Sequence, residues 1–264
     1  MPAEVEGFSI NQTTTAQERP VSVTVLISTG QRLMGGLNNN YILADPEGRF
    51  YVWRVPKRRI KIFGEIEEEL RQTGFLDSGG IYGFRKPMEQ VQFMEETSRL
   101  GLKNHAPLYT DGHGILLPYI EGILLDQYLS RGNMNATFQV LENLSLAHSM
   151  GVVYGDRWVK NTIVTEREDV VEIDFDMKLG GKYAKEFEMA QILYHLLHFS
   201  SDRRNVLNFL KGYLKSKKLS ESYDVSALCL FLFGYMKYFE GKEYEEKIGG
   251  REEILDLIKM VTTS

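Results

Sequence analysis

The sequence predicts an α+β fold, in which a small antiparallel sheet in the first half is followed by a mostly helical second half. Three observations predict it. Runs of β-branched and aromatic residues, separated by glycine and asparagine turns, fill residues 21–55. Apolar residues at helical spacing dominate residues 123–264. A chain of 264 residues is long enough for one large core or two modest lobes.

The composition excludes several classes of protein. Basic residues number 31 and acidic residues 36, so a broad basic surface is absent and we expect no nucleic-acid partner. A single cysteine, Cys229, excludes an internal disulfide or zinc site. No apolar run approaches the ~20 residues of a membrane span, and residues 1–20 are polar and rich in Thr and Gln. We therefore expect a cytoplasmic protein whose residues 1–20 form a disordered tail.

Strands are predicted over residues 21–27, 41–43 and 50–55, where β-branched and aromatic residues are dense. The loop between the first two strands contains Gly36 and Asn38 and is rich in residues that tolerate left-handed conformations. Such a loop exposes backbone amides that can cover an anion such as a phosphate group. A plain hairpin turn is the alternative for the same residues.

Residues 61–85 look like an insertion, and the sequence does not indicate its role. It contains an acidic helix over residues 65–70 and a glycine-rich segment over residues 77–83. The next helix is predicted to begin at Pro87 and to end at Gly101, because proline favours a helix start and glycine a helix end.

The second half is predicted to be mainly helical. Residues 137–150 carry apolar side chains at spacings of three and four and are followed by a glycine. A second apolar stripe runs over residues 187–197, and the remainder to residue 264 is also expected to be helical.

The most informative motif lies between these two helices. Asp156 and Asn161 are five positions apart, and Asp174 follows thirteen positions later. Two β-branched runs, 162–165 and 170–173, are joined by four polar residues and predict a short hairpin. The hairpin would bring Asn161 and Asp174 side by side in space.

These three side chains suit phosphoryl transfer from ATP. A carboxylate at Asp156 can orient an acceptor hydroxyl and take its proton, while Asn161 and Asp174 supply oxygens for Mg2+ beneath the triphosphate. We therefore expect Asp156 as the catalytic residue, Asn161 and Asp174 as metal ligands, and ATP and Mg2+ as cofactors.

The same spacing resembles that of the protein-kinase-like superfamily, in which H-R-D-x-x-x-x-N precedes D-F-G. It is most similar to small atypical members, which include RIO kinases, lipopolysaccharide kinases and aminoglycoside or choline phosphotransferases. Two positions depart from the pattern, because Tyr154 replaces the histidine and Asp176 replaces the glycine. Tyr154 can still pack as a ring under residues 174–176, the expected metal loop, whereas Asp176 is either a further metal ligand or a sign of weakened ATP use.

This resemblance implies a two-lobed protein-kinase-like fold. A small antiparallel-sheet N-lobe would span residues 21–117, a hinge residues 118–122, and a mostly helical C-lobe residues 123–264. At the hinge, the carbonyl of Pro118 and the N–H of Ile120 would bind adenine.

The resemblance also assigns residues to the phosphates. Arg54 stands where typical kinases carry a phosphate-binding lysine, and Lys57 is the competing candidate. A glutamate on the helix after Pro87 would order Arg54, with Glu89 as the first choice and Glu96 as the second. Together with Gly36 and Asn38 from the glycine-rich loop, these residues form the expected nucleotide site.

The segment after Asp174 is short. Only about a dozen residues separate it from the next predicted helix, which leaves no room for a long activation segment of the kind that regulates protein kinases. At the start of that helix, Glu186 or Glu188 would brace residues 154–161, the expected catalytic loop, as an aspartate does in the relatives.

The sequence therefore favours a phosphotransferase that moves the γ-phosphate of Mg-ATP to a hydroxyl of an unknown acceptor, which is a small molecule, a glycan or a protein. The alternative is a kinase-like pseudoenzyme that acts as a nucleotide-binding or scaffold module. Arg54, Tyr154 and Asp176 are the three residues that motivate this alternative.

Overall fold

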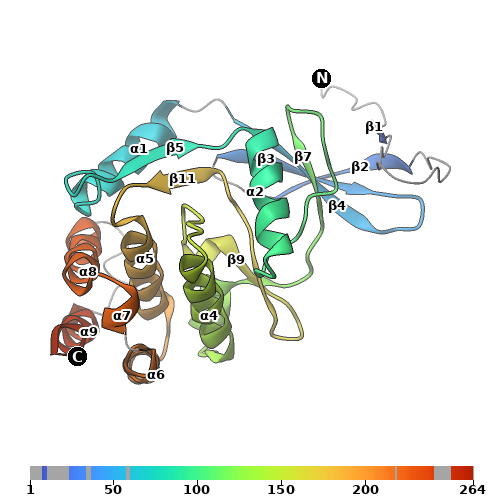
Figure 1. Ribbon diagram of the computed structural model, residues 1–264. Coiled ribbons are helices and arrows are strands. Elements are labelled where there is room, and N and C mark those ends of the chain that lie inside the picture. Colours follow the sequence, from blue (N-terminus) through green and yellow to red (C-terminus); the bar gives the residue numbers. More distant parts are fainter. Residues whose placement is uncertain are drawn as a thin grey trace.

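The structure is a computed structural model that describes residues 8–10, 24–33, 37–57, 60–217, 219–240 and 251–263. Figure 1 shows a sheet built from the first part of the chain beside a group of helices built from the second part. The predicted α+β class, with a small antiparallel sheet followed by a mostly helical region, is confirmed.

The main sheet has six strands in the order β1-β2-β3-β4-β7-β6, and every neighbouring pair is antiparallel. Its strands are β1 (Phe8–Ile10), β2 (Thr24–Leu33), β3 (Asn38–Ala44), β4 (Phe50–Pro56), β6 (Tyr109–Thr110) and β7 (Ile115–Pro118). Leu26, Leu43 and Leu116 form the small core of this sheet. β1 pairs with β2, so these three residues of the expected tail belong to the sheet, while the rest of residues 1–20 lie outside the described residues.

Helix α2 (Pro87–Arg99) lies against this sheet and begins at the predicted proline. The side chain of Glu89, in its first turn, accepts a hydrogen bond from the backbone N–H of Lys86 at 2.8 Å. This contact satisfies one of the free N–H groups at the helix start. The buried face of α2 carries Gln90, Met94 and Thr97.

The rest of the described chain is mainly helical and holds the large core. Its elements are β8 (Ile123–Leu124), α3 (Leu125–Ser130), α4 (Asn135–Ser149), β9 (Thr162–Val164), β10 (Val170–Glu172), β11 (Met177–Gly180), α5 (Ala184–Phe199), α6 (Arg203–Ser216), α7 (Leu219–Ser222), α8 (Val225–Phe239) and α9 (Arg251–Thr263). Helix α5 is buried along nearly its whole length and packs against α8. It therefore forms the centre of the helical part.

The predicted hairpin is present. β9 and β10 pair antiparallel, with Thr162 opposite Glu172 and Val164 opposite Val170. The backbone N–H of Ile173 donates to the carbonyl of Asn161 at 2.8 Å. The residues that enter and leave the hairpin are thus neighbours, as the sequence predicted.

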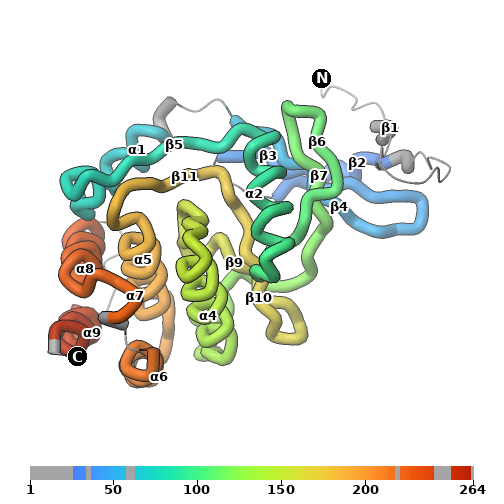
Figure 2. Tube along the Cα trace, viewed as in Figure 1, coloured from blue at the N-terminus to red at the C-terminus, as the bar shows by residue number. Residues whose placement is uncertain are grey.

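The insertion forms a strap, defined here as residues 60–86, that runs from the sheet to the helices and back. Its helix α1 (Ile60–Gln72) packs on α8, and its strand β5 (Ile81–Phe84) pairs antiparallel with β11. Between them, Phe75 is fully buried against Phe187 and Phe231, at ring distances of 4.5 and 6.2 Å. Figure 2 shows the strap lying over the ends of α5 and α8.

No helix in the described part of the chain has both the length and the apolar character needed to cross a membrane.

Candidate functional site

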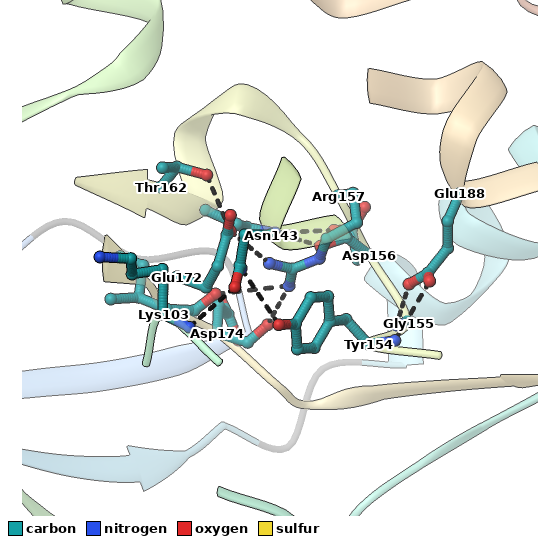
Figure 3. Close-up of polar contacts among 12 residues, drawn as sticks. Lys103, Asn143, Tyr154, Gly155, Asp156, Arg157, Thr162, Glu172, Asp174 and Glu188 are labelled. Carbon is teal, nitrogen blue, oxygen red and sulfur yellow. Dashed lines mark hydrogen bonds and ion pairs between the residues drawn. The ribbon is translucent and has the colours of Figure 1, made fainter. Parts of the chain in front are cut away.

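Helix α5 holds the loop that carries Asp156. The carboxylate of Glu188 accepts hydrogen bonds from the backbone N–H groups of Tyr154, at 3.2 Å, and of Gly155 (Figure 3). His148, on α4, contacts the same carboxylate through Nε2 at 2.8 Å. Of the two candidates for a brace, Glu188 therefore contacts the loop, whereas Glu186 accepts from the backbone N–H of Asp224.

Tyr154 fills the position below the metal loop. Its side chain is fully buried, and its ring lies 5.6 Å from that of Phe175, the residue after Asp174. Its hydroxyl accepts from Nδ2 of Asn143 at 3.1 Å, and Oδ1 of Asn143 accepts from the N–H of Lys103 at 2.8 Å. Tyr154, which departs from the expected motif, is thus packed and hydrogen-bonded.

Arg157 joins the catalytic loop to the metal loop. Its guanidinium donates to the carboxylate of Glu172 at 2.8 Å and to the backbone carbonyl of Asp174 at 3.0 Å (Figure 3). Both Arg157 and Glu172 are buried, so the ion pair is shielded from water and restricts the relative movement of the two loops.

The structure brings Asp156, Asn161 and Asp174 together. Nδ2 of Asn161 donates to the backbone carbonyl of Asp156 at 3.1 Å and to its Oδ2 at 3.2 Å. Burial raises the pKa of Asp156 to about 6, and the nearby charge of Asp174 adds to the rise while Arg157 opposes it. Asp174 has a left-handed backbone, with φ of 62°, which turns the chain sharply at the metal loop.

Arg54 faces the metal loop from the sheet. Its Nη1 lies 3.4 Å from Oδ1 of Asp174 and 3.7 Å from Oδ1 of Asp176. Nδ2 of Asn38 donates to the other oxygen of Asp176. Burial, followed by the charge of Asp174, raises the pKa of Asp176. Asn38 therefore contacts the metal loop directly, and its role as a phosphate contact stays a prediction.

These side chains fit a magnesium ion. The amide nitrogen of Asn161 donates to Asp156, so the amide oxygen of Asn161 is available to bind a metal ion. Oδ1 of Asp176 is buried without a hydrogen bond, and a cation between Asp174 and Asp176 would reduce their repulsion. No group of three or more His, Cys, Asp or Glu side chains with metal-site geometry occurs among the described residues. The ion would therefore need phosphate oxygens to complete its shell, as magnesium commonly does.

A cavity of about 790 Å3 lies between the sheet and the helical part. Apolar side chains from both sides, Val52 and Leu117 from the sheet and Ile163 from β9, line it together with polar groups of the candidate site. The predicted site residues on its wall are Arg54, Pro118, Ile120, Asn161 and Asp174. The expected hinge and the expected phosphate and metal groups thus face one cavity.

Among the predicted site residues in the described part of the chain, those that do not line this cavity are Asn38, Glu89, Asp156, Asp176 and Glu188. Glu89 is exposed and caps α2, so Arg54 pairs with Asp174 and Asp176 in its place. Glu96, the second choice, is exposed as well. Gly36 lies outside the described residues.

Three residues that the sequence analysis did not single out also hold the site. Gln191, on α5, accepts the N–H of Arg157 through Oε1 at 2.5 Å and donates to Oδ1 of Asp156 at 2.9 Å. Arg85 and Glu69 come from the strap. Gln191 lies three residues after Glu188 and hence on the same helix face, which is a signal that could have indicated it.

No family model and no curated protein matches the chain. Among solved structures, the chain is similar to the Rio2 kinase in its ADP/Mg2+-phosphoaspartate complex from Chaetomium thermophilum. The sequence identity is 13%, the match covers 88% of this chain and 71% of that chain, and the TM-score is 0.44.

Proposed function

We propose that this protein is a phosphotransferase that moves the γ-phosphate of Mg-ATP to a hydroxyl group. The observation that carries the proposal is the convergence of Arg54, Asn161 and Asp174 on one cavity, with Asp156 hydrogen-bonded to Asn161 behind its wall. The four side chains come from a strand, two loops and a short helical turn, and their combined chemistry matches the needs of phosphoryl transfer.

The reaction places each side chain in a defined role. The acceptor hydroxyl would donate a hydrogen bond to Asp156, which takes the proton as the acceptor oxygen forms its bond to the γ-phosphorus. The bond from the γ-phosphorus to the β,γ-bridging oxygen breaks, and ADP leaves with that electron pair. A carboxylate with a pKa of about 6 is mostly ionised at neutral pH and is ready to accept the proton.

Charge around the phosphates comes from both sides of the cavity. Arg54 would bind phosphate oxygens with its guanidinium, exchanging part of its pairing with Asp174 and Asp176. Asn161 and Asp174, with Asp176 as an additional ligand, would hold magnesium, which when bound neutralises charge that develops on the phosphates. Lys160 also lines the cavity and adds a positive charge at the same wall.

The adenine would bind at the apolar end of the cavity. Val52 and Ile163 line the cavity from opposite sides, and Pro118 and Ile120 would supply backbone groups to the adenine. We place the domain boundaries accordingly, with an N-lobe up to residue 117, a hinge over residues 118–122 and a C-lobe from residue 123.

The test measures ATP hydrolysis and self-phosphorylation by purified protein with magnesium. Wild-type protein should turn over ATP, and Asp174→Ala should lose that activity together with the magnesium-dependent rise in melting temperature that ATP causes. Glu47→Ala, a change in the exposed β3–β4 turn, is the control and should behave as wild type. Equal activity in wild type and Asp174→Ala would reject the proposal.

A second candidate function is a kinase-like module that binds partners without catalysis. The observation that favours it is the pair of ionic contacts from Arg54 to Asp174 and Asp176, which occupy the guanidinium that would otherwise bind phosphate. Thermal stability measured with ATP alone and with Mg-ATP separates the two functions, because a partner-binding module without a nucleotide site gains no stability from either.

A further inference from the structure

Both oxygens of the Asp156 carboxylate are held by hydrogen bonds. Oδ2 accepts from Asn161 at 3.2 Å, and Oδ1 accepts from Nε2 of Gln191 at 2.9 Å. The amide orientation of Gln191 is fixed because its oxygen accepts the backbone N–H of Arg157. Gln191 is buried, and its side chain supports the catalytic loop.

The carboxyl group of Glu69 contacts the same amide group of Gln191. Its Oε1 lies 3.5 Å from Nε2 of Gln191 and 3.1 Å from the hydroxyl of Tyr235, on α8. The side chain of Trp158, two residues after Asp156 in the catalytic loop, interacts with the same carboxyl group and acts to lower its pKa. One side chain of the strap therefore receives donors from α5 and from α8.

The partners of Glu69 are all donors, so they need an oxygen acceptor at this position and do not require a negative charge. Burial raises the pKa of Glu69 to about 8, and the charge of Asp156 adds to the rise, while the interactions with Tyr235, Trp158 and Gln191 oppose it. The group is thus mainly a neutral carboxylic acid at pH 7, and a glutamine should replace it closely.

The position of Glu69 follows from how the strap is anchored. Helix α1 packs on α8, and Leu70, next to Glu69, is buried in the large core. Phe75 fixes the following turn in that core. Figure 1 shows α1 above α8 and beside the end of α5, far in sequence from the residues that it contacts.

We propose that Glu69 is a positioning residue for the catalytic loop: from the docked strap it fixes Gln191, and through Gln191 the orientation of Asp156. This inference rests on the proposed phosphotransfer. Loss of the contact would release the Gln191 amide, so Asp156 would be misplaced while the cavity for the nucleotide, which Glu69 does not line, stays intact.

The test compares Glu69→Leu, Glu69→Gln and the exposed control Glu68→Leu. In Glu69→Leu, kcat for phosphotransfer should fall by about tenfold to a hundredfold, because small displacements of a catalytic group cost rates of this order, while KM for ATP changes little. Glu69→Gln should restore most of kcat, and Glu68→Leu should match wild type. A wild-type kcat in Glu69→Leu, or an equal loss in the leucine and glutamine variants, would overturn the proposal.

A second measurement does not depend on activity. Hydrogen exchange of the backbone amides over residues 154–161 should be faster in Glu69→Leu than in wild type, and unchanged exchange would overturn the positioning role even if the wild type does not transfer phosphate. Absence of Mg-ATP turnover in the wild type would instead count against the proposed function. Gln191→Glu, which keeps an acceptor for the Arg157 N–H but places a carboxylate against Asp156, should lose kcat as well, and an unchanged kcat in that variant would contradict the route through Gln191.

Discussion

Gly155 is the residue on which the catalytic loop turns. Its φ of 123° is a conformation that residues with a Cβ rarely adopt, and an added Cβ would collide with the carbonyl of Met177 on β11. The N–H of the same glycine also donates to the carboxylate of Glu188. A glycine before Asp156 is therefore a structural requirement of this site.

We expect Gly155→Ala to lower the free energy of unfolding by at least about 3 kcal/mol, since backbone strain and a backbone clash add together. Gly151→Ala is the matched control, because Gly151 also has a positive φ, of 75°, but meets nothing within 4 Å. Its expected loss is about 1–2 kcal/mol. Urea denaturation of both variants measures the difference, and equal losses would show that the contact with Met177 is unimportant.

Glu69 gives a prediction for pH. The folded chain keeps a proton on Glu69 up to about pH 8, whereas the unfolded chain loses it near the ordinary value of 4.5. The folded state thus binds more protons across this window, so the contribution of Glu69 to stability falls as pH rises from about 5 to 8 and is constant above it.

The groups that interact with Glu69 are Asp156, Gln191, Trp158, Tyr235 and Tyr238, and the change Glu69→Gln leaves all five in place. We expect the melting temperature of wild type to decline more steeply between pH 5 and 8 than that of Glu69→Gln. Other buried groups contribute equally to both proteins, so the difference in slope isolates Glu69. Parallel slopes would mean that its proton is lost at an ordinary pKa.

At this scale, spacing alone was enough to indicate Asp156, Asn161 and Asp174, because a hairpin with matched strands fixes where its ends meet. The partner of Arg54 was not predictable in the same way. A glutamate in the first turn of a helix can serve as a cap or face another element, and the sequence does not distinguish these roles at Glu89. Glu69 carried no signal, since its partners are more than eighty positions away.

At the scale of elements, Arg85 connects the strap to the two loops of the candidate site. Its guanidinium donates to the carbonyls of Val153, Tyr154, Phe175 and Met177, and therefore joins the catalytic loop to the metal loop. The predicted acidic helix and the glycine-rich stretch are both present in α1 and β5, but the pairing of β5 with β11 was not predictable. Strand pairing between residues almost a hundred positions apart leaves no periodic trace in the chain.

We expect Arg85→Lys to destabilise the protein by about 1–3 kcal/mol, because a lysine ammonium cannot reach all four carbonyls and leaves some of them without donors. The control is Arg71→Lys, at an exposed ion pair with Glu67 on the same strap, where a change within about 0.5 kcal/mol is expected. Chemical denaturation measures both. An unchanged free energy of unfolding in Arg85→Lys would mean that water satisfies the carbonyls equally well.

For the whole molecule, the strap should join the sheet and the helical part into one cooperative unit. Each part contains one tryptophan, Trp53 in β4 and Trp158 after Asp156. Phe75→Ala, which opens a cavity in the large core, should cost about 3–5 kcal/mol. We expect Trp53 and Trp158, followed separately after replacing the other with phenylalanine, to report the same lowered transition. A shift confined to Trp158 would show that the two parts unfold independently.

The crossings of the chain also bear on how the cavity exchanges its contents. Within the described residues, the chain passes between the sheet and the helices at the return from β5 into α2 and again at residues 118–122. Two connections limit how far the sheet and the helices can move apart, so for the proposed phosphotransfer we expect ADP to leave through local movement of β2 and β3, whose Leu33 and Asn40 line the cavity. An engineered cross-link between β2 and β3 should then slow the release of ADP while leaving the strap undisturbed.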